Sequence, residues 1–357
     1  MKKKIIHFIF NLGRGGAETM LVRVLKELNE YENVVVTLFP LDHFGKELQC
    51  DKLICLNLRS LFSLPFAVFK FRRVVKREKP DIVHTHLFWP TVIARLGVPR
   101  KIPLITTIHA FIASSVEYRH WYIALIDKLT YRFRRSIIIV VARGALDEYF
   151  SFLKLKPYKA YALYTFVDID RFNSSGIPAK PSSAVFRVIS VGALRTQKNH
   201  VFLISAFAKM KDRPIELHIY GTGNLEHQLQ QQIEDTGARI VLKGEVKNIE
   251  QVIPQYDLYV MSSGFEGFSL SVLEAMAMRM PLLLSDISSF REQCEGIADF
   301  FSLADTNDFI QKIRTISLKS KEELEAQGEK GRQKVVDNFT LPRHMEGLRK
   351  IYTEALS

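Results

Sequence analysis

The sequence has little cysteine and no long apolar segment. It contains three cysteines in 357 residues, an odd number, and none stands in a Cys/His pattern with the spacing of a zinc site. A disulfide framework is therefore disfavoured, and a reducing compartment such as the cytoplasm is expected. No apolar run approaches the roughly 20 residues that a membrane-spanning helix needs, so we expect no membrane span.

The first residues, MKKKIIHFIF, imitate a secretory signal in their lysines and apolar run. His7 and Asn11 interrupt that pattern, and no small-residue cleavage site follows. We therefore predict that this segment is the first β-strand.

Acidic residues are scarce in the first half of the chain. Residues 1–165 contain 27 Lys and Arg against 13 Asp and Glu, a balance of +14, whereas residues 166–357 contain 23 against 25, a balance of −2. This asymmetry favours an acidic partner for the first half, either a nucleic acid or an anionic membrane surface.

Short apolar runs alternate with helix-length segments through most of the chain. Many runs are continuous, as expected for parallel strands that are buried on both faces. They predict an α/β protein of two doubly wound domains, with a linker in the Gly-, Pro- and Ser-rich residues 174–183 and a helical end over residues 321–357. The predicted strands are residues 4–10, 33–39, 81–85, 103–109, 136–142, 186–192, 215–221, 239–244, 257–263, 281–286 and 298–302.

A glycine-rich turn follows the first predicted strand in NLGRGGAETMLVRVLKEL (11–28). Gly15 and Gly16 allow a phosphate or sugar to approach backbone amides at a helix start. The dinucleotide fingerprint is excluded because Glu18 stands where its third glycine is expected. The alternative is a tight turn with no ligand.

Histidines end two predicted strands, in DIVHTH (81–86) and TTIHAF (106–111). Open α/β sheets bind ligands at the carboxyl ends of their strands, and His109 is the better candidate because the run before it is clearly a strand. The alternative is a structural histidine with satisfied hydrogen bonds.

Two further turns lie in the second half. VGALRTQKNH (191–200) places Arg195 and Lys198 beside Gly192, where two cations suit a diphosphate whose charge grows as it departs. YGTGN (220–224) adds Gly221 and Gly223. Solvated surface charges are the alternative for the cations. In VDIDRF (167–172), a turn or helix cap is favoured over a metal site for the Asp-x-Asp pair.

The stretch EGFSLSVLEAMAM (266–278) contains two carboxylates, Glu266 and Glu274. Ser271 and Glu274 have the spacing of a capping box at a helix N-terminus. The same helix start can bind phosphate through its amides while the carboxylates accept sugar hydroxyls. Both interpretations remain open from the residues alone.

Taken in order, these motifs resemble the retaining GT-B glycosyltransferases of glycosyltransferase family 4 over nearly the whole chain. The most specific element is Glu266 and Glu274 with seven residues between them, supported by Arg195 and Lys198 about 70 residues earlier. The resemblance implies two Rossmann-like domains that face each other across a cleft. It implies an acceptor-binding domain over 1–170, a nucleotide-sugar-binding domain over 171–335, and a C-terminal helix, 336–357, that packs on the first domain.

The resemblance also implies roles for single residues. Glu266 would bind hydroxyls of the donor sugar, Glu274 the ribose hydroxyls, and the amides of Ser269 to Ser271 the phosphate, assisted by Arg195 and Lys198. His109 would contact the donor sugar. The implied catalytic residues are Glu266, His109, Arg195 and Lys198. The implied substrate-binding residues are Gly15, Gly16, Glu18, Gly192, Gly221, Gly223, Gly267, Phe268, Ser269, Leu270, Ser271 and Glu274.

Two positions depart from the family pattern. Ala193 stands where many relatives carry arginine, and we assign that charge to Arg195. Arg279 stands where glycine is usual, at the end of the helix that contains Glu274. If this position needs positive φ, arginine is strained there by about 1 kcal/mol or more.

The implied function is transfer of a sugar from a nucleoside diphosphate, most simply UDP, to a hydroxyl of a glycan or lipid-linked acceptor, with retention and without a metal or cofactor. Bacterial surface polysaccharide or glycolipid synthesis is the expected setting. The alternatives are a GT-B sugar-nucleotide epimerase and, from another class, a non-catalytic membrane or nucleic-acid adaptor. The adaptor would explain the balance of +14 but not the carboxylate pair.

Aromatic and basic residues are interleaved in residues 60–80 and 118–135, a mixture that suits the headgroups of an anionic leaflet. We therefore expect a cytoplasmic protein that binds peripherally to the inner face of the cell membrane, and no nucleic-acid partner. The alternative is a pair of ordinary amphipathic helices with their aromatics in the core.

Overall fold

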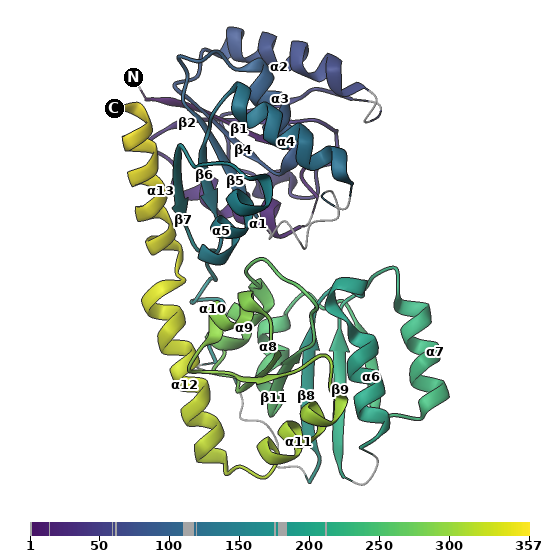
Figure 1. The fold of residues 1–357 in the computed structure, drawn as a ribbon. Coiled ribbons are helices and arrows are strands. Elements are labelled where there is room, and N and C mark those ends of the chain that lie inside the picture. The colour runs from purple at the N-terminus through teal and green to yellow at the C-terminus, as the bar shows by residue number, and fades with distance from the viewer. Residues whose placement is uncertain are drawn as a thin grey trace. The chain divides into compact units, whose positions relative to one another are not determined.

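A computed structural model describes residues 2–13, 15–58, 60, 63–109, 118, 120–174, 176–177, 184–210 and 213–357. The chain divides into two compact units, Met1–Thr165 with Leu341–Ser357, and Phe166–Thr340 (Figure 1). Each unit is an α/β structure around one parallel sheet, which confirms the predicted fold class.

The first unit contains a seven-stranded sheet in the order β3-β2-β1-β4-β5-β6-β7, and every neighbouring pair is parallel. The strands are β1 Lys4–Ile9, β2 Glu32–Thr37, β3 Lys52–Cys55, β4 Ile82–His86, β5 Leu104–Ile108, β6 Ile137–Val140 and β7 Lys159–Ala162. The sequence did not predict β3 and β7. Both are four-residue edge strands with exposed or half-buried side chains, so they lack the continuous apolar run of a central strand.

Helices cover the first sheet. Helices α2, α3 and α4 pack side by side, whereas α13 contacts both α1 and β4. The alternation of β1 explains the two cores: Ile6 and Phe8 pack with α2 and α3, while Ile9 packs with α1. The helices of this unit are α1 Gly16–Glu27, α2 Leu64–Glu78, α3 Phe88–Gly97, α4 Trp121–Phe133, α5 Arg143–Leu153 and α13 Leu341–Leu356, with a 3₁₀ turn η1 at Gly45–Glu47.

The second unit contains a six-stranded parallel sheet in the order β10-β9-β8-β11-β12-β13. Its strands are β8 Phe186–Val191, β9 Ile215–Tyr220, β10 Ile240–Gly244, β11 Leu258–Met261, β12 Leu282–Ser285 and β13 Asp299–Phe301. Its helices are α6 His200–Ala208, α7 Glu226–Thr236, α8 Ile249–Val252, α9 Leu270–Ala277, α10 Ser288–Cys294, α11 Thr306–Ile316 and α12 Lys321–Asn338, with 3₁₀ turns η5 Thr196–Lys198 and η6 Ile253–Gln255. In both sheets the strand order reverses beside the first strand, at β1/β4 and at β8/β11, which is where open α/β sheets bind ligands.

The predicted helical end is present as α12 and α13, separated by Phe339 and Thr340. A capping box formed by Ser320 and Glu323 begins α12. The stretch 174–183, where a linker was predicted, falls within the range of the second unit, and residues 175 and 178–183 lie outside the described residues. Among the described helices, none combines the length and the apolar character that crossing a membrane requires.

Candidate functional site

Two glycine turns of the second unit pack backbone against backbone at the ends of β8 and β9. Leu194 N donates a hydrogen bond to Thr222 O at 3.0 Å. Gly221 has φ +137°, and a Cβ there would lie 2.1 Å from Gly192 O, while a Cβ on Gly223 would lie 2.4 Å from Leu194 O. Both glycines are therefore required by close backbone approach, which larger residues would prevent.

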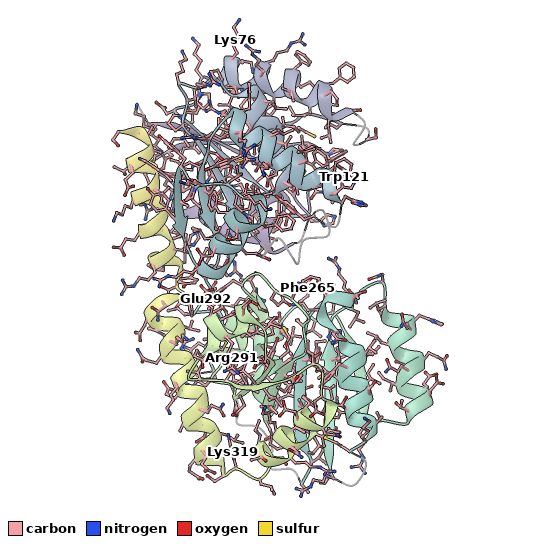
Figure 2. All side chains as sticks on the ribbon, in the orientation of Figure 1. Lys76, Trp121, Phe265, Arg291, Glu292 and Lys319 are labelled. Carbon is pink, nitrogen blue, oxygen red and sulfur yellow. The ribbon has the colours of Figure 1, made fainter. Side chains whose placement is uncertain are left out.

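Glu266 is the central charged group of this strand edge. It lies in the loop between β11 and α9 beside Phe265, which is marked in Figure 2, and is 7% exposed. Its carboxylate accepts hydrogen bonds from Lys198 Nζ at 2.7 Å, Ser263 Oγ at 2.7 Å and Gln197 Nε2 at 3.2 Å. The carboxylate is thus paired and oriented before any ligand binds.

Of the two predicted cations, Lys198 is the one that contacts Glu266. Lys198 ends η5, and its side chain lies over Gly192, where a Cβ would come within 3.1 Å of Lys198 Cε. Arg195 is exposed at the start of η5. The structure therefore unites Lys198, Glu266 and Gly192 and leaves the Arg195 side chain in solvent.

The capping box of Ser271 and Glu274, one of the two interpretations left open by the sequence, is not formed. Helix α9 begins at Leu270 with Ser269 as its N-cap, so Ser271 and Glu274 both lie inside the helix. The spacing alone does not determine which residue is the cap, because the buried Gln293 bonds to Ser269, two positions before Ser271. Ser269 N donates to Gln293 Oε1 at 3.1 Å, and Gln293 Nε2 donates to Ser269 O at 2.9 Å.

The amide of Ser269 is thereby occupied, whereas Leu270 and Ser271 stand in the first helical turn, where amides have no intrahelical acceptor. Glu274 is half-buried one turn further on. Tyr259 connects this helix to β8: its hydroxyl donates to Val191 O at 3.3 Å, and burial raises its pKa, while a hydrogen bond with Ser271 lowers it.

Gly267 and Phe268 are buried rather than presented to solvent. The ring of Phe268 packs edge-on against Phe339, with 5.1 Å between the ring centroids. Phe268 therefore anchors the loop that contains Glu266. No sequence pattern indicated Gln293, Tyr259, Gln197 or Ser263, since each joins the site through tertiary packing.

The glycine turn of the first unit leads into α1. Gly15 is the N-cap and Gly16 the first helical residue, and both are exposed. The backbone of Gly15 is extended, but a Cβ there would lie 2.4 Å from Glu18 Oε2, so the Glu18 carboxylate occupies the space above it. Burial raises the pKa of Glu18.

His109 follows β5, and its Nε2 lies 3.3 Å from Nδ1 of His86, the last residue of β4. Burial lowers the pKa of His109 to about 3, with a smaller contribution from His344. The ring is therefore neutral near pH 7.

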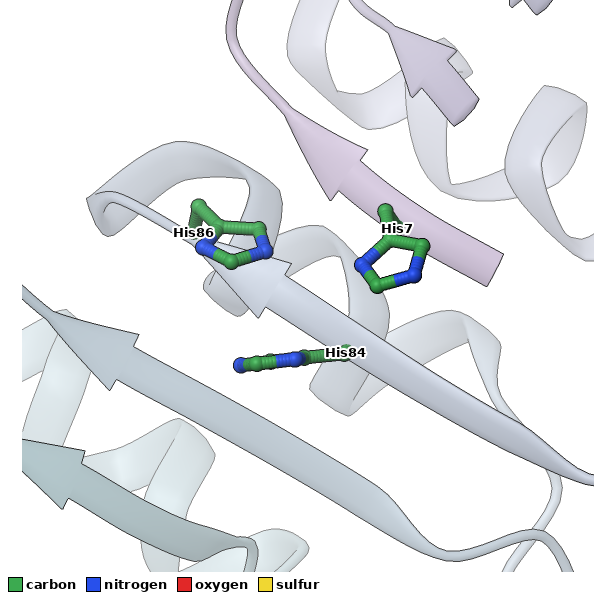
Figure 3. A group of neighbouring side chains, drawn as sticks. All are labelled: His7, His84 and His86. Carbon is green, nitrogen blue, oxygen red and sulfur yellow. The ribbon is translucent and has the colours of Figure 1, made fainter. Parts of the chain in front are cut away.

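Three more imidazoles, those of His7, His84 and His86, lie close together (Figure 3), and His86 is the one that contacts His109. His7 of β1 is in direct register with His84 of β4, and the two-residue repeat of a strand places His86 on the same face. Burial lowers the pKa of His7 to about 4 and those of His84 and His86 well below 6.5. The HxH pattern beside a histidine in the first strand could have predicted this cluster.

Known proteins give an independent view of the chain. Residues 14–171 match the family described as Glycosyltransferase Family 4, and residues 185–318 match Glycosyl transferases group 1. The N-acetylgalactosamine-N,N'-diacetylbacillosaminyl-diphospho-undecaprenol 4-alpha-N-acetylgalactosaminyltransferase of Campylobacter jejuni is 24% identical over 88% of this chain and 90% of its own length. The UDP-Gal:alpha-D-GlcNAc-diphosphoundecaprenol alpha-1,3-galactosyltransferase of Escherichia coli is 23% identical over 84% and 82%.

Among solved structures, Anabaena HepE in complex with UDP-glucose superposes with a TM-score of 0.83 at 16% identity, over 98% of this chain and 99% of HepE. A glycosyltransferase from Rickettsia africae gives a TM-score of 0.80 at 17% identity, over 100% and 99%. These likenesses concern the fold. Together with the two family matches, which span most of both units, they establish that the chain is a glycosyltransferase of family 4 with the GT-B fold.

Proposed function

We propose that the enzyme transfers a sugar from a UDP-sugar to a hydroxyl of a lipid-linked or glycan acceptor, with retention, in bacterial surface polysaccharide or glycolipid synthesis. The observation that carries this proposal is the buried Glu266–Lys198 pair at the switch point of the second sheet. Two relatives support the acceptor class, since their names specify diphospho-undecaprenol substrates, and the name of the second specifies UDP-Gal and an α product.

The donor would lie along the start of α9. The free first-turn amides of Leu270 and Ser271 and the positive end of the helix dipole would hold the diphosphate, with Ser269 excluded by its bond to Gln293. Glu274 would accept the ribose hydroxyls and Glu266 the sugar hydroxyls. Gly192, Gly221, Gly223 and Gly267 would let the nucleotide and sugar approach the backbone.

Lys198 would have two roles. In the structure its ammonium neutralises Glu266 at 2.7 Å. In the reaction, the same ammonium would offset the charge that grows on the departing UDP, an electrostatic effect that acts most strongly where water is excluded. Arg195, exposed at the start of η5, would add long-range attraction for the diphosphate.

The reaction would follow front-face attack. The bond from C1 of the sugar to the β-phosphate oxygen breaks, the acceptor hydroxyl oxygen bonds to C1 on the same face, and its proton passes to the departing phosphate. Positive charge develops at the sugar ring, where the Glu266 carboxylate stabilises it. No residue of the chain has to form a covalent intermediate.

The first unit would supply the acceptor side. Gly15 and Gly16 are exposed at the start of α1, where their amides would bind the acceptor. His109 would contact the donor sugar as a neutral hydrogen-bonding group, because burial holds its pKa at about 3.

The enzyme would reach a lipid-linked acceptor by binding the membrane through a protein surface on α2 and α4. On α2, Phe66 and Phe69 are 69% and 66% exposed, and on α4 Trp121 is 77% exposed with Leu125 and Leu129 one and two turns further. Lys76 and Trp121 both project outward in Figure 2. We define the membrane-binding surface as these five apolar residues with Arg72, Arg73 and Lys76. Such a mixture is expected to dock peripherally on the inner face of an anionic membrane. Phe62, in the predicted stretch, lies outside the described residues.

The activity is tested by incubating the protein with a panel of nucleotide sugars and detecting slow donor hydrolysis, then transfer to an undecaprenyl-diphosphate-linked sugar. Glu266→Gln should lower turnover at least about tenfold while UDP affinity stays within a few fold, because the lost charge acts at the sugar. Unchanged turnover in this variant would remove Glu266 from the mechanism. Absence of hydrolysis with every donor would remove the proposed reaction.

A further inference from the structure

The histidine cluster behind His109 contains two buried nitrogens for which no described residue provides a hydrogen-bond partner. They are His7 Nδ1 and His86 Nε2. In Figure 3 a nitrogen of each of these rings faces the other ring. A buried polar atom without a partner destabilises the folded state, so the pair calls for an explanation.

Asn33 determines which ring nitrogen of His7 carries the proton. The Asn33 side-chain nitrogen donates to Leu28 O at 2.9 Å, so Asn33 Oδ1 is an acceptor and the His7 nitrogen 3.2 Å away, Nε2, must be the donor. A neutral imidazole carries one proton. His7 Nδ1 therefore carries a lone pair and needs a hydrogen-bond donor.

A small cavity adjoins these rings. It measures about 20 Å³, and apolar residues of α1, β6 and α13 form part of its wall. Its polar lining residues are His7, His84, His86, Thr107, His344 and Tyr352. A volume of this size holds a single water molecule. His7 Nδ1 and His86 Nε2, the two unpartnered nitrogens on its wall, are the kind of polar groups that keep such a water ordered.

Hydrogen bonding and charge favour water over a metal ion. One nitrogen from each of His7, His84 and His86 lies within 4.8 Å of the others, so the three rings surround one small site. Both nitrogens of His84 already bond, to Tyr352 Oη and Thr107 Oγ1, each at 2.7 Å. Among the described residues that line the cavity, none is an Asp or Glu that could offset a dication.

We propose that His86 is a positioning residue for His109, held in place from behind by His7 through one buried water. The water donates one hydrogen to His7 Nδ1 and the other to His86 Nε2. His86 then carries its proton on Nδ1 and donates it to His109 Nε2. His109 consequently keeps its own proton on Nδ1, the nitrogen left to donate to a ligand.

This inference rests on the proposed role of His109, which is to make a neutral, oriented hydrogen bond at the donor sugar. It assigns to β1 and β4 a function that they serve without contacting substrate. The orientation of a ring through its second nitrogen is the ordinary way in which a functional histidine is held in one tautomer.

Two substitutions of His86 separate positioning from packing. His86→Asn keeps an amide group at the level of Nδ1, next to His109, whereas His86→Gln moves the amide to the level of Nε2. We expect His86→Gln to lower kcat about tenfold with KM for the donor within a few fold, and His86→Asn to recover most of that loss. His84→Gln is the matched control, because His84 is equally buried but bonds to Tyr352 and Thr107 instead of His109.

His84→Gln should lower the melting temperature with kcat within about threefold of the wild type. Equal losses of kcat in His84→Gln and His86→Gln would overturn the proposal, because packing alone would then explain them. No difference between His86→Asn and His86→Gln would overturn it as well.

A second measurement does not depend on turnover. Heteronuclear NMR of isotope-labelled histidine rings in the full-length protein reports which nitrogen of each ring carries the proton. We expect protonation of His7 on Nε2 and of His86 and His109 on Nδ1, with His109 changing in His86→Gln and unchanged in His84→Gln. If these tautomers are found but no nucleotide sugar is consumed, the proposed reaction is wrong and the positioning network remains supported. Stoichiometric metal in the purified protein by elemental analysis, lost in His7→Phe, would replace the water and overturn the proposal.

Discussion

The central strands of the two sheets end in opposite kinds of chemistry. In the first unit, β1, β4 and β5 bring together His7, His84, His86 and His109, all held neutral by burial. In the second unit, the turns after β8 and β11 bring together the charged pair Lys198 and Glu266.

Net charge follows the opposite pattern, with the first half of the chain strongly basic and the second half nearly balanced. Residues 1–165 carry a balance of +14, yet the four histidines brought together in their sheet are neutral and exposed cations such as Arg72, Arg73 and Lys76 stand on the outer helix α2. Residues 166–357 are nearly balanced at −2, yet their sheet edge is ionic. The comparison teaches that the chemistry of an edge is set by local burial and pairing, whereas net charge reports on the outer surface.

The largest expected difference between the two units is their loss of folding stability in acid, which should be greater in the first unit. The pKa values of His7, His84, His86 and His109 lie below the unfolded value of about 6.5, at about 4 for His7 and about 3 for His109. Below pH 6.5 the unfolded chain therefore binds more protons, so stability is complete above that pH and is lost as pH falls through the folded values. Each histidine contributes about 1.4 kcal/mol per pH unit.

Hydrogen exchange at about pH 7 and about pH 5, corrected for intrinsic rates, should show earlier loss of protection in β1 and β4 than in β8 and β11. In the second unit, His200 is the comparably shifted group, with a pKa of about 4. Equal loss of protection in both units would contradict this prediction.

The Lys198–Glu266 pair is tested by Lys198→Ala, which should lower kcat/KM about a thousandfold. This change removes a cation from the diphosphate and leaves the buried Glu266 carboxylate without its counter-ion, a situation that is strongly unfavourable. In a double-mutant cycle with Glu266→Gln, the two losses should be far from additive because the groups act as a pair. Additive losses would mean that they work independently.

The outer cations are tested by vesicle co-sedimentation. Replacement of Arg72, Arg73 and Lys76 by Ser should weaken binding to anionic vesicles by up to about 3 kcal/mol, about 1 kcal/mol per cation, and leave UDP affinity unchanged. The matched control replaces Lys243, Lys247 and Lys330, which are exposed in the second unit, and should leave sedimentation unaltered. Equal binding to neutral vesicles, or insensitivity to salt, would favour a soluble acceptor.

Glu274→Ala should weaken UDP binding by roughly 1–3 kcal/mol, since hydrogen bonds to a charged acceptor are lost. The melting temperature should change little, because Glu274 forms no capping box in α9. Calorimetry with UDP and thermal unfolding of the same variant check both parts. A lowered melting temperature with unaltered binding would show a purely structural role.

The smallest expected effect is a gain of about 1 kcal/mol in stability for Arg279→Gly, since Arg279 has φ +58°, as its position in the family pattern predicted. The exposed ion pair with Glu329 that is lost contributes little. Gly328→Ala is the opposite control, because its Cβ would lie 1.9 Å from Arg279 O and should destabilise the protein.

Sequence patterns predicted the central strands well, because burial on both faces leaves a continuous apolar run such as IIIV in β6. They missed β3 and β7, where edge strands need no such run. They identified the turns of Gly192, Gly221 and Gly223, and at Gly221 and Gly223 close backbone approach leaves glycine as the only choice.

The same patterns misplaced the cap of α9 and missed Gln293, which lies 24 positions from Ser269 in the chain. Capping spacing is a local rule, whereas the start of α9 is decided by a partner on another helix. Pairing of Lys198 with Glu266 was likewise beyond local reasoning, although each residue had been identified separately.

Helix α13 has a consequence for the order in which the protein is made. It packs on α1 and β4, and Tyr352 Oη bonds to His84 in the core of the first unit (Figure 1). The first 165 residues therefore leave the ribosome without the side chain that completes their core, and the second unit is synthesised in full before that side chain arrives. On a translating ribosome, where domains generally fold from the N-terminus onward, the later unit would be the first to reach its final structure.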